Sequence, residues 1–172
     1  RDPNTGTVIP GGYGIAKRST GLQASLINAT LTSITGNAME IAGVGKNTDN
    51  GDYSRITLTN SNVTAASGQR VLDVGNQTVS FFNNNTNQNE TATFTTDGFA
   101  FVAHHTSLIG DIAISDDSQN INLLFDQGTQ LTGNININAT NNLVLTANHA
   151  TLTGNITVGD NSRDITLSFN QG

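Results

Sequence analysis

The pentapeptide Leu131-Thr132-Gly133-Asn134-Ile135 has two near copies in the last third of the sequence. One copy, Leu108-Ile109-Gly110-Asp111-Ile112, precedes it, and the other, Leu152-Thr153-Gly154-Asn155-Ile156, follows it at a similar spacing. A unit of about 22 residues holds two or three short strands and is too small to bury its own apolar face. Such units bury a continuous narrow core only when they stack on one another.

Each copy is followed, at a nearly constant distance, by a segment in which apolar and polar residues alternate. The apolar positions of these segments are Ile121, Leu123 and Phe125, then Leu143, Leu145 and Ala147, then Ile165, Leu167 and Phe169. Alternation with a period of two is typical of half-buried strands. Chain order makes the strands of successive units parallel and about 4.8 Å apart. We therefore expect an all-β fold, a parallel solenoid with one face of each strand in a thin core.

The first half of the chain repeats less strictly. Leu26-x-Asn28-x-x-Leu31-Thr32 recurs as Leu58-x-Asn60-x-x-Val63-Thr64, and the same offset relates Gly43 to Gly75. This period is longer than that of the last third, which predicts inserted loops. We place them at 46–52 and 83–91 because these segments are polar. At about 22 residues per coil, the chain would make about eight coils.

Length and composition agree with one solenoid domain. We expect a single unit over 1–172, with less regular coils at 11–105 and regular repeats of about 21–23 residues at 106–172. The 24 Asn, 25 Thr and 18 Gly residues suit many short strands and turns. The net charge of −6 argues against a nucleic-acid partner. The absence of Cys excludes a disulfide framework and a thiol nucleophile.

The carboxylates do not form a recognisable catalytic set. Asp116 and Asp117 are adjacent, so on a strand they would face opposite ways. Glu40, Asp73 and Asp97 are single residues to which the spacing assigns no partner. We therefore expect no catalytic residues.

Two further groups of polar residues also point to structure and not to chemistry. Asp111 is replaced by Asn134 and Asn155 at the equivalent repeat positions, which indicates a structural ladder. His104 and His105 are consecutive, so one metal ion could not easily bind both. We expect no metal and no cofactor.

The Leu-Thr-Gly-Asn-Ile block and the Ile-Thr-Leu strand that follows it resemble the passenger domains of bacterial autotransporters, the pertactin-like and AIDA-like adhesins. The segment Gly11-Gly12-Tyr13-Gly14-Ile15, which leads into the first coils, resembles the upstream repeats of the same family. The resemblance covers most of residues 11–75 and 106–172. It implies a single-stranded, right-handed parallel β-helix and, in the full-length chain, a C-terminal β-barrel translocator. We expect the chain to be a fragment of such a passenger.

The resemblance also implies a function and a location. The passenger would be displayed on the bacterial cell surface or secreted, as a virulence adhesin that attaches to a host surface glycan or protein, or to another copy of itself. Parallel β-helices also include polysaccharide lyases and hydrolases, so a glycan-cleaving enzyme is the alternative. A stalk without a ligand is a third possibility.

Binding residues are expected on the two inserted loops, because functional residues gather on loops over a rigid scaffold. The candidates are Asn47, Asp49, Asn50 and Asp52 in the first loop and Asn84, Asn85, Asn87 and Asn89 in the second.

Overall fold

The computed structural model describes residues 15–17, 21–47, 50–83, 87–115 and 117–171. These residues form β-strands and no helix, so no helix in this part of the chain could span a membrane. The prediction of an all-β fold is confirmed. The strands are β1 (Ile15–Lys17), β2 (Gln23–Ile27), β3 (Thr30–Thr32), β4 (Met39–Ala42), β5 (Ser54–Thr59), β6 (Asn62–Thr64), β7 (Arg70–Gly75), β8 (Gln77–Asn83), β9 (Gln88–Phe94), β10 (Asp97–His104), β11 (Ser107–Ile109), β12 (Asp111–Ile114), β13 (Gln119–Asp126), β14 (Gln130–Thr132), β15 (Ile135–Ile137), β16 (Asn141–Asn148), β17 (Thr151–Thr153), β18 (Ile156–Val158) and β19 (Arg163–Asn170).

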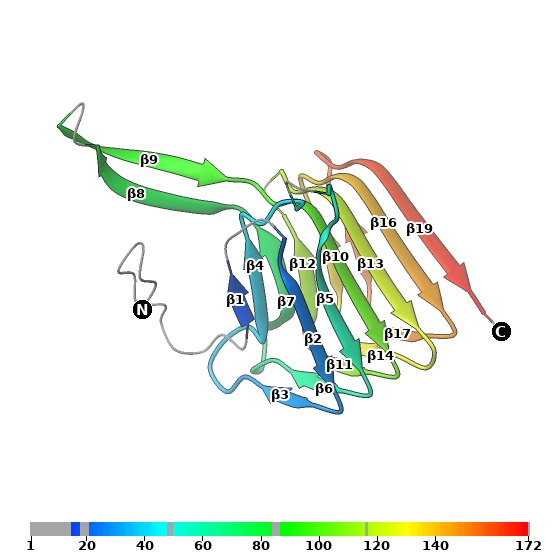
Figure 1. Cartoon of the computed structure of the whole chain (residues 1–172). Coiled ribbons are helices and arrows are strands. Elements are labelled where there is room, and N and C mark those ends of the chain that lie inside the picture. Colours follow the sequence, from blue (N-terminus) through cyan, green and yellow to red (C-terminus); the bar gives the residue numbers. More distant parts are fainter. Residues whose placement is uncertain (1–14, 18–20, 48–49, 84–86, 116, 172) are drawn as a thin grey trace.

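All strands except β8 and β9 belong to three sheets of parallel strands. In each sheet the strands lie side by side along the same direction, so that the molecule forms one stack (Figure 1). Sheet A contains β1, β4, β7, β12, β15 and β18; sheet B contains β2, β5, β10, β13, β16 and β19; sheet C contains β3, β6, β11, β14 and β17. The chain visits them in the repeating order A, B, C. This arrangement is compatible with a solenoid. The expected number of about eight coils is not confirmed, because the described residues contribute six strands to each of the longest sheets.

Strand register reproduces the sequence repeats. Leu131 pairs with both Leu108 and Leu152, so the spacing between copies of the pentapeptide is the register offset between neighbouring strands. In the first half, the predicted match of Leu26 with Leu58 is also found in register.

In sheet A, the paired residues of β4 and β7 are one residue further apart in sequence than the paired residues of the first half in sheets B and C. The expected match of Gly43 with Gly75 is therefore wrong. Gly75 pairs with Ala42. The reason is that the segment from Thr64 to Leu72 is one residue longer than the segment from Thr32 to Met39.

The core lies between the sheets and is built from the inward positions of each strand. Leu123 and Leu145, which pair in register, are fully buried, as predicted. The rings of Phe101 and Phe125 pack edge to face, with centroids 6.2 Å apart. Burial of these side chains is the main stabilising contribution to a fold with so few apolar residues.

Buried hydroxyl groups line two corners of the stack. At the corner between sheets A and B they are Ser54, Thr96, Ser118 and Thr140, and at the corner between sheets B and C they are Ser61, Thr106 and Thr129. Thr129 Oγ1, for example, lies 2.8 Å from the carbonyl oxygens of both Ala103 and Asp126. Because Ser and Thr supply a donor in little volume, they satisfy main-chain carbonyls where the chain changes direction.

Strands β8 and β9 form an antiparallel ribbon that projects from the stack (Figure 1). Asn83 of β8 pairs with Gln88 of β9, so strand pairing extends into the predicted loop from both sides. The predicted loop over 83–91 is therefore too long. Its second half belongs to β9, because strand pairing satisfies the main-chain groups of residues 88–91.

Candidate functional site

The first predicted binding segment, 46–52, lies between β4 and β5 and forms no strand in its described part. A main-chain hydrogen bond joins the two ends of this segment: the Asn47 N–H donates to the Asp52 carbonyl at 2.7 Å. The Asn50 amide donates to the Asp52 carboxylate at 2.6 Å, and the Asp52 main-chain N–H donates to Asn50 Oδ1 at 3.0 Å. The structure thus brings Asn47, Asn50 and Asp52 together. Asp49 lies outside the described residues.

The described part of the second predicted segment lies at the end of the ribbon that β8 and β9 form. Asn87 is exposed in the turn with φ = 56°, and Asn89 is exposed in β9 opposite Phe82. Asn84 and Asn85 lie outside the described residues. Asn89 belongs to a two-stranded sheet that is separate from the strands on either side of the segment 46–52.

The base of the ribbon is fixed to the stack at defined points. A Cβ atom added at Gly43, where φ is +64°, would lie 2.8 Å from Phe94 Cβ. Thr96 Oγ1, which follows β9, donates to the carbonyl of Gly75 at 2.6 Å. The ribbon therefore leaves the stack where Phe94 lies close against the main chain of position 43, a contact that favours glycine there.

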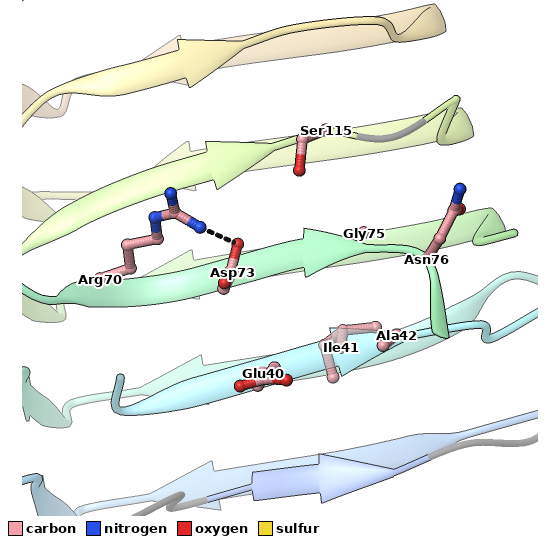
Figure 2. Close-up of a pocket in the computed structure, with 8 residues that line it drawn as sticks. All are labelled: Glu40, Ile41, Ala42, Arg70, Asp73, Gly75, Asn76 and Ser115. Atoms are coloured by element: carbon pink, nitrogen blue, oxygen red, sulfur yellow. Dashed lines mark hydrogen bonds and ion pairs between the residues drawn. The ribbon is translucent and has the colours of Figure 1, made fainter. Parts of the chain in front are cut away.

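A hollow of about 90 Å³ lies on the outer side of sheet A (Figure 2). Its floor contains the small residues Ala42 and Gly75, which leave space above the strands. The residues that line it are Glu40, Ile41, Ala42, Arg70, Asp73, Gly75, Asn76 and Ser115. This hollow is a candidate small-molecule site.

Charged groups gather at one end of the hollow. Glu40 of β4 and Asp73 of β7 are partners in strand register. Arg70 donates to one oxygen of Asp73 at 2.8 Å, and the Asn37 amide donates to the other at 3.2 Å. The interpretation of Glu40 and Asp73 as residues without a partner was wrong. Their pairing was concealed because they are one position further apart than the offset that relates Leu26 to Leu58.

An unpaired acceptor lies at the other end of the hollow. Asn76 follows β7, and its buried Oδ1 atom has no hydrogen-bond partner among the described residues. Ser115, which follows β12, also lines this end (Figure 2). A ligand that fits the hollow would need a hydrogen-bond donor to pair with this oxygen.

The remaining titratable candidates are dispersed. His104 Nδ1 lies 3.5 Å from Asp126 Oδ2, whereas His105 is exposed at a corner with φ = 48°. Asp97 accepts a hydrogen bond from the Asn120 amide at 2.6 Å. Within the described ranges, no three His, Asp or Glu side chains are placed to hold a metal ion.

The aspartate pair at 116–117 is only half described. Asp117 is exposed with φ = 58°, and Asp116 lies outside the described residues.

No family model, no curated protein and no solved structure matches this chain.

Proposed function

We propose that the three sheets are the faces of a right-handed parallel β-helix, and that the chain is an adhesin passenger displayed on or secreted from a bacterial cell. Three features support this proposal. The repeat resembles autotransporter passengers, the repeats stack in register, and the chain has no Cys. In the full-length protein, a C-terminal β-barrel would translocate this segment.

The observation that carries the adhesive function is the ribbon of β8 and β9. It forms a sheet of its own and projects away from the three parallel sheets (Figure 1). A segment that leaves a rigid scaffold is suited to contact a partner, because it can be reached without disturbing the core. The partner would be a host surface glycan or protein, or another copy of the chain.

The test is a binding assay with fluorescently labelled protein on host cells and extracellular matrix. We compare the wild type with a variant in which residues 78–93 are replaced by a short Gly-Ser linker. The matched control is Thr146→Lys, an outward change on sheet B far from the ribbon in sequence. We expect the linker variant to lose binding and the control to keep it. Equal binding by all three proteins would exclude the ribbon, and absence of binding by the wild type would favour a stalk.

The second candidate function, glycan cleavage, is favoured by the register pairing of Glu40 with Asp73 beside Arg70. Glycoside hydrolases use two carboxylates, and a cation beside an acid is suited to a lyase. The test is incubation with defined oligosaccharides and mass spectrometry of the products. New, shorter products that disappear in Glu40→Gln and persist in Asp160→Asn, an exposed carboxylate outside the hollow, would establish this activity.

A further inference from the structure

The outer edge of β8 has no strand beside it in the part of the chain that the structure describes. β8 pairs with β9 over the whole strand, from Gln77 opposite Phe94 to Asn83 opposite Gln88, and these two strands form a sheet of their own. An edge strand presents main-chain N–H and C=O groups that can pair with another chain. The ribbon therefore has two edges, one on β8 and one on β9.

β8 lacks the features by which proteins protect an exposed edge. Its sequence, Gln-Thr-Val-Ser-Phe-Phe-Asn, contains no charged residue and no Pro, and all its residues pair with β9 without a register shift. Lys, Pro and bulges are the usual means of preventing an edge from pairing with another chain. β8 therefore has none of these means of protection.

The ribbon also lacks the support that a two-stranded sheet needs. An isolated hairpin is marginally stable in water, and three or more strands are needed for independent stability. The other described strands of the molecule have neighbours in sheets of five or six strands. A partner strand on β8 would give the ribbon the same kind of support.

We propose that the ribbon binds a second copy of this chain through antiparallel pairing of β8 with β8. This inference deepens the proposed adhesive function, since it names the partner of the same ribbon. Charge selects β8 over β9: two uncharged β8 strands meet without repulsion, whereas pairing of β9 with β9 would bring two Glu90 residues to one interface. The product is a four-stranded intermolecular sheet with β9 on both outer edges.

The pairing predicts which residues face each other. Ser80 is the middle residue of β8 and is exposed, so in a symmetric antiparallel pair the two Ser80 residues lie opposite each other. Thr91 is the direct partner of Ser80 within the ribbon. In the four-stranded sheet the two Thr91 residues are separated by three strand spacings, roughly 14 Å, which is too far for a disulfide.

The test combines cross-linking with sedimentation velocity. The chain has no Cys, so Ser80→Cys and Thr91→Cys each introduce a single thiol. With diamide as oxidant, we expect rapid disulfide-linked dimers of Ser80→Cys and none of Thr91→Cys. We also expect wild-type protein to dimerise as its concentration rises and Ser80→Lys to remain monomeric with unchanged circular dichroism.

Three results would overturn the proposal: a wild type that stays monomeric at high concentration, equal cross-linking of the two cysteine variants, or a dimer that survives in Ser80→Lys. The cell-binding assay separates this outcome from failure of the proposed function. If the protein is monomeric and still binds cells through the ribbon, the adhesin function is supported and the β8 interface is excluded. If β8 dimers form but the protein binds no cells, self-association is supported and attachment to host cells is excluded.

Discussion

The Oδ1 atom of Asp111 accepts a hydrogen bond from the main-chain N–H of Asn134 at 2.7 Å and lies 3.3 Å from the Asn134 side-chain amide nitrogen. Asn134 Oδ1 in turn accepts the main-chain N–H of Asn155 at 3.0 Å. The polar residue of each repeat thus binds the main chain of the next repeat. The prediction that these positions form a structural ladder is confirmed.

This ladder predicts that a hydrogen-bond acceptor at position 111 contributes more to stability than the negative charge of Asp111 does. Asp111→Ala should lower the free energy of unfolding by about 1–2 kcal/mol, because the Asn134 N–H loses its partner. Asp111→Asn should change it by less than about 0.5 kcal/mol, since Asn134 makes the same bond with an amide oxygen. Urea unfolding followed by circular dichroism measures both. Equal destabilisation of the two variants would show that the carboxylate charge is required.

The glycine of the repeated pentapeptide is required by the close approach of successive layers. Gly133 has φ = +154°, and a Cβ atom there would collide with the carbonyl group of Gly110. This neighbour is main chain and cannot move aside as a side chain could. Gly133→Ala should therefore cost about 2–4 kcal/mol of unfolding free energy.

Gly68→Ala is the matched control for the glycine prediction. Gly68 has φ = +73° with no atom within 4 Å of an added Cβ, so only conformational strain of about 1 kcal/mol is expected. Urea midpoints of the two variants should differ clearly. A Gly133→Ala variant no less stable than Gly68→Ala would show that the layers can separate without cost.

The repeats predicted the second half of the fold well because each strand there stacks on a copy of itself. Leu108, Leu131 and Leu152 pair as expected from their positions alone. The strand register of the first half was harder to predict, because a single added residue before β7 makes the separation between paired residues of β4 and β7 longer than the repeat in the sequence indicates. Local patterns do not reveal such a shift.

The inward assignment of the regular strands can be tested at neighbouring positions. Leu145 is fully buried, whereas Thr146 points to the opposite side of β16 and is half-buried. Leu145→Asp should destabilise by at least about 4 kcal/mol, because it removes an apolar side chain and buries a charge. Thr146→Asp should cost much less. An unchanged melting temperature for Leu145→Asp would refute the core assignment.

The candidate site was only partly predictable. Polar content marked 46–52 and the tip of the ribbon, but Thr78 and Thr93, whose hydroxyl oxygens lie 3.0 Å apart across the ribbon, show that pairing begins well before the Asn-rich segment. Alternating β-forming residues on both sides of that segment were the missed signal for a hairpin. The hollow could not be predicted, because it depends on the register of Glu40 with Asp73 and on a buried acceptor at Asn76.

The role of the corner hydroxyls can be tested with a substitution that removes the hydrogen-bond donor and keeps the side-chain volume. Thr129→Val leaves the carbonyl oxygens of Ala103 and Asp126 without the hydroxyl that now lies 2.8 Å from each. Since Thr129 is fully buried, water cannot replace it freely. We expect a loss of about 1–3 kcal/mol, measured by urea unfolding. Thr132→Val, an exposed change on sheet C, should be nearly neutral, and equal stability of the two variants would contradict the role of the buried hydroxyl.

Shortening the ribbon should leave the stack intact. Residues 84–89 lie within the predicted loop at 83–91 and contain the first two residues of β9, whereas the contacts that fix the base, at Gly43 and Thr96, lie outside the deletion. We expect the deletion variant to keep its melting temperature within about 2 °C, because surface loops tolerate length changes at little cost. Thermal unfolding followed by circular dichroism measures this. Loss of the β-sheet signal at room temperature would show instead that the ribbon is part of the folding core and cannot serve as a separate contact element.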